Sequence, residues 1–401
     1  MSNVVIVFNA GSSSLKFTVF QIIGKTRIQK LLKGRIEYDV DTFHFFAFGQ
    51  DDQLIEGTTQ PQQHIKPLQY LLDWLAEHEQ GRHNIIGAGH RIVHGGAHFL
   101  APIQVTPAIL TQLEALTPFA PLHQPQTLAP VHAIVEYLPN LPQIACFDTA
   151  FHRTMPEIAR LLPLPRHYAQ KGVIRYGFHG LSYDYLTQRL EQIDPQLAKG
   201  RTILAHLGSG ASLCAIREGK SVETTMGFSA LDGLMMGSRC GMIDPGVLLY
   251  MLREEKADWD TLVNTLYHQS GLLGVSGLSS DMRVLREHVS HEENLTARVP
   301  IQQALDLSVY RIVEEIGALA AIMEGLDGLV FTAGIGEHDA QLRQDVCQAL
   351  GWLGLKLDAQ ANAHHASIIT TPDSRIRVRV EPTHEELVIC QNVLPFVQDR
   401  L

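Results

Sequence analysis

The chain has 401 residues, 45% of them hydrophobic, with a formal net charge of -10 and an isoelectric point near 6.0. At about 150 residues per domain, this length predicts two or three domains with sizeable cores. The acidic balance provides no basic field for a polyphosphate backbone. We therefore expect no nucleic-acid partner, and we expect any anion to be bound by a few cationic or hydrogen-bonding groups at its site.

The five cysteines are scattered, odd in number and without Cys-x-x-Cys spacing. This usage favours a reduced, cytoplasmic protein over a disulfide-stabilised secreted one. The sequence opens with no basic segment followed by an apolar one, and no apolar run reaches the roughly 20 residues that cross a bilayer. We therefore expect a soluble protein with no membrane partner.

The first predicted elements are two apolar, β-branched runs around a Gly-Ser-Ser-Ser segment, in VVIVFNAGSSSLKFTVF at residues 4–20. The runs favour strands and the small residues favour a turn, so the pattern predicts a hairpin. Asn9, three serines and Lys16 crowd this hairpin. Exposed amides, hydroxyls and a lysine suit a phosphate group, although Ser-rich hairpins are more often simply solvated.

Further strand-like runs alternate with amphipathic stretches and predict an α/β chain. The predicted strands are 4–8, 17–20, 85–88, 143–147, 202–207, 211–216, 328–331 and 376–380. The clearest helix is predicted at about 302–324, where apolar residues recur at helical spacing around much of the circumference. Such a helix should be buried between layers or at a subunit interface.

One hairpin design occurs twice, because TILAHLGSGASLCAI at 202–216 repeats the strand, Gly-Ser turn and strand of the opening stretch. If each copy begins a βββαβα unit, the chain is a duplicated pair of α/β domains that face each other across a cleft, with the break near residue 150. In GLVFTAGIGEH at 328–338, a Gly-x-Gly turn after a strand would turn backbone amides toward a phosphate or ribose. Together with the turns of the two hairpins, this makes three small-residue turns that follow strands, and such a set favours a nucleotide held between two domains.

Two polar motifs follow predicted strands in the first half. GHRIVHGG places Arg91 among glycines, where its planar fork suits a carboxylate or phosphate, with a surface ion pair as an equal alternative. His90 and His94 in the same motif make a poor zinc pair, because no third ligand is in view. FDTAFH places Asp148 at the carboxyl end of a strand, where open α/β sheets keep their sites, or where it could cap a helix.

Three later motifs complete the polar inventory. His179 in RYGFHG and Arg239 in GLMMGSR lie in glycine-flanked loops, and turn capping is the alternative for the histidine. In THEEL, Glu385 and Glu386 favour the positive end of a C-terminal helix, or one of them holds Mg²⁺. There is no nucleophile elbow and no dinucleotide fingerprint. The inventory suits phosphoryl transfer, in which positioning and charge neutralisation do most of the catalysis.

The motifs resemble, in order and spacing, those of the acetate kinases, within the acetate and sugar kinase, Hsp70 and actin superfamily. They are NAGSSSLKF, GHRIVHGG, APLH, FDTAFH, RYGFHG, HLGSGAS, GLMMGSR, SGLLGVSGLSSDMR, FTAGIGE and PTHEEL. The resemblance implies duplicated RNase H-like (actin-like ATPase) domains with the active site in the cleft. It implies a first domain at 1–150, completed by the C-terminal helix 385–401, and a second at 151–384 that binds nucleotide and forms a homodimer.

The implied activity is direct in-line transfer of the ATP γ-phosphoryl group to acetate, giving ADP and acetyl phosphate, with Mg²⁺ or alternatively Mn²⁺. By motif, the metal contacts are Asn9 and Glu385, the substrate contacts are Arg91, Val93 and His123, and the phosphate turn contains Ser12 and Ser14. Asp148 is similar to the proposed acid/base residue, and His179 and Arg239 to the transition-state stabilisers. Implied nucleotide contacts are Lys16, His206, Leu207, Gly208, Ser209, Gly210, Asp281, Met282, Arg283, Gly334, Ile335, Gly336, Glu337 and His338.

These roles make physical sense for acetate, which is already deprotonated at neutral pH. The obstacle is to bring one anion against a polyanion, and arginines and a metal remove it. Asp148 could therefore order a water, a metal-bound ligand or Arg91 rather than move a proton. The chain departs from the family pattern at Ser209, Met242, His338 and His384, and at Tyr183, where the family usually has a histidine. Because Ser209 keeps a hydroxyl for phosphate, we expect the site to survive.

Two other activities remain open. Ala230 stands where the family often has a proline in the acyl pocket, and room for one methylene is worth about 1 to 3 kcal/mol of discrimination, which makes propionate the alternative substrate. An Hsp70- or actin-like ATPase is disfavoured because no large peptide-binding insertion is present. A cysteine enzyme would need Cys240, whose thiol pKa the adjacent Arg239 would lower.

Overall fold

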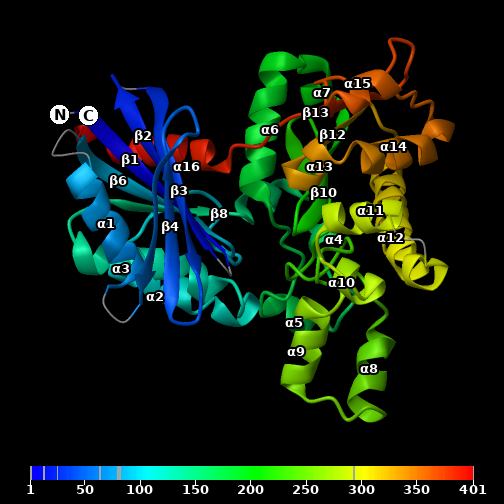
Figure 1. Cartoon of the computed structure of the whole chain (residues 1–401), viewed down its shortest axis with the longest axis horizontal. Coiled ribbons are helices and arrows are strands. Elements are labelled where there is room, and N and C mark those ends of the chain that lie inside the picture. The colour runs from blue at the N-terminus through cyan, green and yellow to red at the C-terminus, as the bar shows by residue number, and fades with distance from the viewer. Residues whose placement is uncertain are drawn as a thin grey trace. The chain divides into compact units, whose positions relative to one another are not determined.

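The computed structural model describes residues 2–11, 14–24, 26–62, 65–78, 83–291 and 294–400. The chain divides into two compact units (Figure 1). The first unit is Met1–Ala150 with His384–Leu401, and the second is Phe151–Thr383. Each unit contains its own mixed sheet, which confirms the predicted α/β class. No helix in the described ranges has both the length and the apolarity to span a bilayer.

The sheet of the first unit has the strand order β5-β4-β3-β2-β1-β6-β8-β7. Its strands are β1 Ser2–Ala10, β2 Ser14–Ile23, β3 Arg27–Tyr38, β4 Thr42–Phe48, β5 Leu54–Pro61, β6 His83–Ile92, β7 Ile103–Gln104 and β8 Gln143–Phe147. The strands β1 to β5 form an antiparallel meander, whereas β6 is parallel to β1 and β8 is parallel to β6. The predicted opening hairpin is confirmed, with Ala10 paired to Leu15 at its tip.

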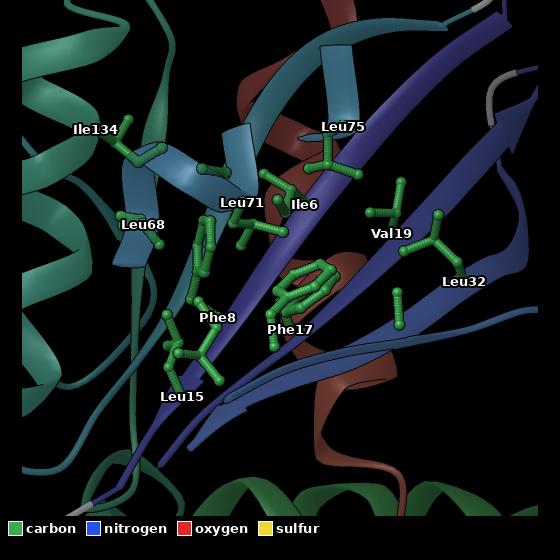
Figure 2. Close-up of a cluster of buried hydrophobic side chains, with 14 of the residues drawn as sticks. Ile6, Phe8, Leu15, Phe17, Val19, Leu32, Leu68, Leu71, Leu75 and Ile134 are labelled. Atoms are coloured by element: carbon green, nitrogen blue, oxygen red, sulfur yellow. The ribbon is translucent and has the colours of Figure 1, made fainter. Parts of the chain in front are cut away.

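One face of this sheet carries the hydrophobic core shown in Figure 2. Alternate residues of the strands point toward α1 Pro67–His78 and α3 Gln124–Tyr137, as the strand period of two requires. The core side chains labelled in the figure are Ile6, Phe8, Leu15, Phe17, Val19, Leu32, Leu68, Leu71, Leu75 and Ile134. The short helix α2 Pro107–Glu114 packs against α3.

The opposite face of β1, β6 and β8 is covered by the C-terminal helix α16 Glu385–Val393. The close approach of α16 to β6 depends on Gly89, because a Cβ there would lie 2.5 Å from Cγ2 of Ile389. The last turns of the chain, η4 Leu394–Phe396 and η5 Gln398–Arg400, follow this helix. Packing of α16 on the sheet therefore fixes where the glutamates at its first turn lie.

The sheet of the second unit has the order β11-β10-β9-β12-β13. Its strands are β9 Arg201–Leu207, β10 Ala211–Arg217, β11 Lys220–Thr224, β12 Gly328–Thr332 and β13 Arg377–Val380. Here β9 to β11 are antiparallel, and β12 and β13 run parallel to β9. The order matches β3-β2-β1-β6-β8 of the first unit, so the predicted duplication is confirmed in the topology.

Helices cover both faces of the second sheet. On one face, α6 Gly180–Ile193 and α7 Pro195–Lys199 pack on the buried side chains of Leu204, Cys214, Ile216 and Val330. The long helix α12 Leu295–Ile322 contacts β9, β10 and β11. The remaining helices are α4 Glu157–Arg160, α5 Arg166–Gln170, α8 Pro245–Arg253, α9 Trp259–His268, α10 Gly271–Ser276, α11 Met282–His291, α13 Ala333–His338, α14 Ala340–Ala349 and α15 Ala359–Ala363.

The predicted strands are present, but three expectations need correction. The first unit has five strands before α1 rather than the three of a βββαβα unit. The long helix begins at Leu295, upstream of the predicted start, because Asn294 caps it by accepting the Thr296 N–H, and Pro300 is tolerated inside it. The expected Gly-x-Gly turn after β12 is instead part of the short helix α13.

Candidate active site

The polar residues of the first unit gather where its parallel strands end. Asn9 lies near the end of β1, Arg91 near the end of β6, and Asp148 directly after β8. Because the carboxyl ends of parallel strands meet at one edge of a sheet, residues far apart in sequence come together there. Glu385 and Glu386, in the first turn of α16, join them through the amide of Asn9.

Arg91 and Asp148 form a buried ion pair. The Arg91 Nε donates to both Asp148 oxygens, at 3.0 and 3.1 Å, and Nη2 donates to Oδ2 at 2.6 Å. The side chains are 20% and 2% exposed, so the alternative of a surface ion pair is wrong. Burial disfavours the charged guanidinium, but Asp148 and Glu385 outweigh it and raise the pKa of Arg91. Arg91 is therefore a permanent cation held in one plane.

Asn9 links this ion pair to the glutamates of α16. Its Oδ1 accepts from Arg91 Nη1 at 3.0 Å, and its Nδ2 donates to Glu385 at 3.3 Å and to Glu386 at 3.4 Å. Burial raises the pKa of the Glu385 carboxyl to about 7, and Arg91 opposes the rise. Both glutamates also occupy the first turn of α16, where the helix dipole favours negative charge.

This donor set fits a magnesium ion. The carboxylate oxygens of Glu385 and Glu386 are ligands that Mg²⁺ prefers, and a cation there would offset the burial that favours neutral Glu385. Asn9 would add an amide oxygen with its side chain turned over, because its Oδ1 faces Arg91 and its NH₂ group faces the glutamates. Among the described residues, no cluster of three or more His, Cys, Asp or Glu forms a complete protein cage. Mg²⁺ commonly keeps several waters and uses one or two carboxylates plus phosphate oxygens, so a partial protein set suits it.

Val93 and His123, the other predicted substrate contacts, lie in segments that Gln124 joins. The Gln124 side chain is fully buried; it accepts from the His94 N–H and donates to the His94 carbonyl, both at 3.1 Å. Val93 is buried directly after β6, and His123 precedes α3. Gln124 was not predicted, because its importance depends on a partner 30 residues away.

His90 and His94 serve packing. The His90 ring stacks on Phe8 with centroids 5.3 Å apart, and Nδ1 of His94 accepts the Gly96 N–H at 2.9 Å. Burial lowers the pKa of His90 to about 3 and that of His94 to about 4, so both stay neutral in the folded protein at neutral pH. Their spacing in the sequence reflects the end of β6 rather than a metal site.

Of the phosphate hairpin, Ser14 and Lys16 are described and Ser12 lies outside the described residues. Lys16 is exposed on β2 and pairs in register with Asn9. It lines a groove of about 640 Å³ on the side of the sheet where α16 begins. Other charged residues lining this groove are Lys30, Lys33, Arg35, Asp52 and Glu386.

In the second unit, His179 and Arg239 converge on the turn between β9 and β10. A Cβ on Gly210 would lie 2.7 Å from Arg239 Nη2 and 3.4 Å from His179 Nε2, so glycine keeps this space open. Nη1 of Arg239 donates to the Ala230 carbonyl at 2.6 Å. The structure thus brings the two predicted transition-state residues beside residues 208–210, which belong to the predicted nucleotide contacts.

The loop before α6 holds His179 in an uncommon conformation, with φ at 57°. The residue is the N-cap of α6, but its side chain makes no capping hydrogen bond, so the turn-capping alternative is wrong. Its ring instead stacks on His206, with centroids 4.1 Å apart. The buried His152 donates from Nε2 to the Phe178 carbonyl at 2.9 Å and so anchors the loop. His152 was not predicted, although it belongs to the FDTAFH motif.

Several of the predicted nucleotide residues line one small apolar cavity in the second unit. Its lining includes Leu207, Gly208, Met235, Met236, Met282, Ser308, Ile312 and Ile335. Asp281 and Arg283 pair with each other at 2.7 Å, and Arg283 lowers the pKa of Asp281. The Arg283 side chain is 88% exposed, so these two charges lie at the surface beside the buried Met282.

Segment 334–338 is held by a residue that was not predicted. Arg343 is fully buried and donates from Nη1 to the carbonyls of Gly336 and Glu337, both at 2.8 Å, which caps α13. Its Nε donates to Asn362 Oδ1 at 2.8 Å. His338 contacts the ring of His365 edge-on. The expected amides at the start of the next helix are already capped, since Asp339 accepts the Leu342 N–H there.

Cys240 does not have the properties of a nucleophile. Burial raises the pKa of its thiol to about 11, which contradicts the expectation that Arg239 lowers it. The Arg239 guanidinium points to the Ala230 carbonyl instead. With so little thiolate at neutral pH, a cysteine-dependent activity at this position has no physical support.

Comparison with known proteins places this geometry in a family. A sequence model of the Acetokinase family matches residues 4–391. The chain is 45% identical over 399 residues to an acetate kinase of Rhodopseudomonas palustris, with 98% of each chain covered. It is 42% identical over 397 residues to an acetate kinase of Rickettsia felis, covering 99% of this chain and 100% of that one.

Solved structures give the same result. The Porphyromonas gingivalis acetate kinase matches with a TM-score of 0.87 at 33% identity, covering 99% of this chain and 100% of that one. A propionate kinase from Francisella tularensis matches with a TM-score of 0.88 at 32% identity, covering 98% and 99%. The sequence matches and the structural matches of the present chain point to the same family: this chain belongs to the acetokinase family.

Proposed function

We propose that this protein is an acetate kinase, which transfers the γ-phosphoryl group of Mg·ATP reversibly to acetate and gives acetyl phosphate and ADP. The observation that carries the proposal is the Arg91 fork, a permanent cation held by Asp148 and Asn9 at the ends of parallel strands. A planar cation in a fixed orientation suits a small carboxylate, because the guanidinium is already ordered before the ligand binds and loses little conformational entropy.

Asp148 acts on Arg91 rather than on a proton in this scheme. Both of its carboxylate oxygens accept from the guanidinium, and acetate needs no general base because it is already ionised. Removal of Asp148 would free the fork to rotate and would remove the charge that balances it. The role of Asp148 is therefore to orient the acetate-binding group.

Asn9 and Glu385 would hold the Mg²⁺ ion, with Glu386 beside them. When bound, the ion neutralises charge on the ATP phosphates so that the acetate anion can approach. In this role Asn9 connects the metal to the acetate clamp, since the same side chain contacts Arg91 and Glu385.

The second unit supplies the donors for the transferring phosphoryl group. His179 and Arg239 meet beside the turn at 208–210, where their N–H groups would stabilise the charge on the equatorial oxygens. Gly208, Met282 and Ile335, which we propose as nucleotide contacts, lie together around a cavity of about 20 Å³, which is too small to hold a base itself. Each unit thus contributes one half of the reaction.

We propose further that the protein is a cytoplasmic homodimer. No residue of α8 or α9 is buried, although both helices are largely apolar. Leu249, Tyr250 and Trp259 are 67%, 57% and 74% exposed. Large exposed apolar side chains on neighbouring elements often mark an interface, so a second copy is expected to cover this helix pair, which extends from the second unit (Figure 1). The free, mostly buried cysteines suit a reducing compartment.

The test is to trap the acyl phosphate with hydroxylamine while ADP release from Mg·ATP is followed, with acetate, propionate and butyrate in parallel. We expect acetyl hydroxamate, formed in proportion to ADP. Slow ADP release that is indifferent to every acid would contradict the proposal and favour an ATPase of the Hsp70 or actin kind.

Propionate is the second candidate substrate. The backbone carbonyl of Ala230 accepts from Arg239, and the Ala230 side chain is a single methyl group where the family often has a proline, so we propose that the acyl site has room for one more methylene. One methylene is worth about 1 to 3 kcal/mol, or roughly 10- to 200-fold in kcat/KM. A kcat/KM for propionate at least equal to that for acetate would move the assignment to propionate kinase, and a strong preference for acetate would remove this candidate.

A further inference from the structure

A buried chain of hydroxyl groups leads to His179. Tyr183 lies in the first turn of α6, just after the N-cap residue His179, and both side chains contact Ser212. The Tyr183 hydroxyl is 2.5 Å from Ser212 Oγ, and Ser212 Oγ is 2.8 Å from His179 Nδ1. Tyr183 and Ser212 are both fully buried. No solvent competes for these hydrogen bonds, so each proton has a defined place.

Which atom donates in each of these hydrogen bonds follows from where the protons are held. Burial raises the pKa of Tyr183 well above its usual value, so the phenol keeps its proton at working pH. The phenol oxygen also has a hydrogen bond from the His206 backbone, which favours negative charge on that oxygen. With that N–H donating to it, the phenol donates to Ser212. Ser212 must then donate its own proton to Nδ1 of His179, which accepts.

The other nitrogen of the same ring, Nε2, lies toward the turn between β9 and β10. A neutral imidazole that accepts at Nδ1 carries its hydrogen on Nε2. The His179 Nε2 atom and the Arg239 Nη2 atom both approach the space above Gly210. The stacked ring of His206 is itself tied through Nδ1 to Ser182 Oγ at 2.9 Å, so the plane of His179 is fixed from one side.

We propose that Tyr183 and Ser212 are positioning residues that hold His179 in the Nε2–H tautomer, so that it donates to the transferring phosphoryl group as a neutral ring. The inference rests on the proposed function, in which His179 stabilises that group. It also accounts for a departure from the acetate kinase pattern: Tyr183 replaces a histidine with a phenol whose proton is not lost in the working pH range.

The first test compares Tyr183→Phe, Ser212→Ala and the double variant in the hydroxamate assay. Each single change is expected to lower kcat by about tenfold, with the KM values for ATP and acetate within about twofold of wild type, because the lost interaction acts in the transition state. The double variant should be no worse than either single one, since both act through one atom of His179. Losses that multiply, or that appear in KM alone, would overturn the proposal.

Two variants separate positioning from simple packing. Tyr185→Phe removes a phenol two positions away on the same helix and should leave kcat unchanged. Tyr183→His restores an N–H donor to Ser212 and should recover most of the activity that Tyr183→Phe loses. If Tyr183→Phe keeps the kcat of wild type, the hydroxyl chain does not matter and the proposal is wrong.

The second test reads the tautomer directly by ¹⁵N NMR of histidine-labelled protein, with the His179 signals assigned by their loss in His179→Gln. Wild type should show hydrogen on Nε2, and Tyr183→Phe should shift His179 toward a mixture of tautomers. Hydrogen on Nδ1 in wild type would overturn the inference even in a fully active acetate kinase. The expected tautomer in a protein without kinase activity would instead contradict only the proposed function.

Discussion

The hairpins β1–β2 and β9–β10 have the same topology but carry different polar pairs. One register position back from each tip, Asn9 pairs with Lys16 in the first unit and His206 pairs with Ser212 in the second. Asn9 belongs to a network of an arginine and carboxylates. Ser212 belongs to a network of a phenol and a histidine. One duplicated scaffold thus holds an arginine–carboxylate network in one unit and a hydroxyl–imidazole network in the other.

The two hairpins also differ in how far helices bury them. In the second unit, α6 packs over β10, and Ser212 is fully buried. In the first unit, α16 covers β1, β6 and β8, and Lys16 on β2 remains exposed beside the basic groove. A buried hairpin can hold precise hydrogen bonds, whereas an exposed one keeps a mobile charge for a soluble anion.

The largest expected effect comes from Arg91→Ala in the first unit. Loss of the fork removes the acetate clamp and leaves the carboxylate of Asp148 buried without its cation, so we expect kcat/KM for acetate to fall by roughly 10³-fold or more. The hydroxamate assay measures this. Arg201→Ala is the matched control, because Arg201 pairs with Asp327 at 2.7 Å on a strand outside the site. Near-normal acetate turnover in Arg91→Ala would contradict the proposal that the first unit binds acetate through Arg91.

Arg343→Met tests the support of the nucleotide segment in the second unit. The variant loses the buried donors to Gly336, Glu337 and Asn362, and we expect a loss of about 3 kcal/mol in unfolding free energy with a raised KM for ATP. Urea unfolding and the ATP dependence of the rate measure the two effects. Arg311→Met, at an exposed ion pair on α12, should change stability by less than about 0.5 kcal/mol. Equal effects of the two changes would contradict this role.

Acid should destabilise both units through their buried histidines. Burial lowers the pKa of His90 to about 3 and that of His94 and His152 to about 4, against 6.5 in the unfolded chain. As pH falls below 6.5 the unfolded state binds protons first, so stability that is present above pH 6.5 is lost toward pH 4. Each histidine contributes up to about 1.4 kcal/mol per pH unit.

Urea unfolding between pH 7 and pH 5 measures this slope. His152→Gln should flatten it in the second unit, even if the variant is less stable at pH 7. His288→Gln, at an exposed position on α11, should leave the slope as in wild type. A pH-independent stability in wild type would show that these rings are protonated or exposed in the folded protein.

The smallest expected effect is that of Cys240→Ser. Burial raises the pKa of this thiol to about 11, so almost no thiolate exists at neutral pH. We expect kcat and both KM values to stay within about twofold of wild type. Complete loss of activity in a variant that melts normally would revive a cysteine-dependent reaction.

The sequence predicted the elements whose pattern is local. β8 was predicted with its observed bounds, because four of its five residues are apolar and all five are buried. β3 was missed, because RIQKLLKGRIEY mixes charged and apolar residues on a half-exposed strand. The Gly-x-Gly segment was read as a turn, because nothing within it shows that Arg343 caps it as a helix.

The candidate site was predicted residue by residue from motifs, but not its connections. Asn9 contacts Glu385 across 376 positions, and Arg91 contacts Asp148 across 57. Such contacts depend on which strands lie side by side and on where α16 packs. Gln124, His152, Ser212 and Arg343 were missed for the same reason, since each matters through a distant partner.

The most direct test of the division of labour is the equilibrium binding of Mg·ATP to Arg91→Ala, measured by calorimetry without acetate. If the first unit holds acetate and the second holds the nucleotide, the Kd should stay within about twofold of wild type while acetyl transfer is lost. A Kd raised in parallel with the loss of activity would contradict the account, because Arg91 would then be a clamp for the ATP phosphates and not for acetate.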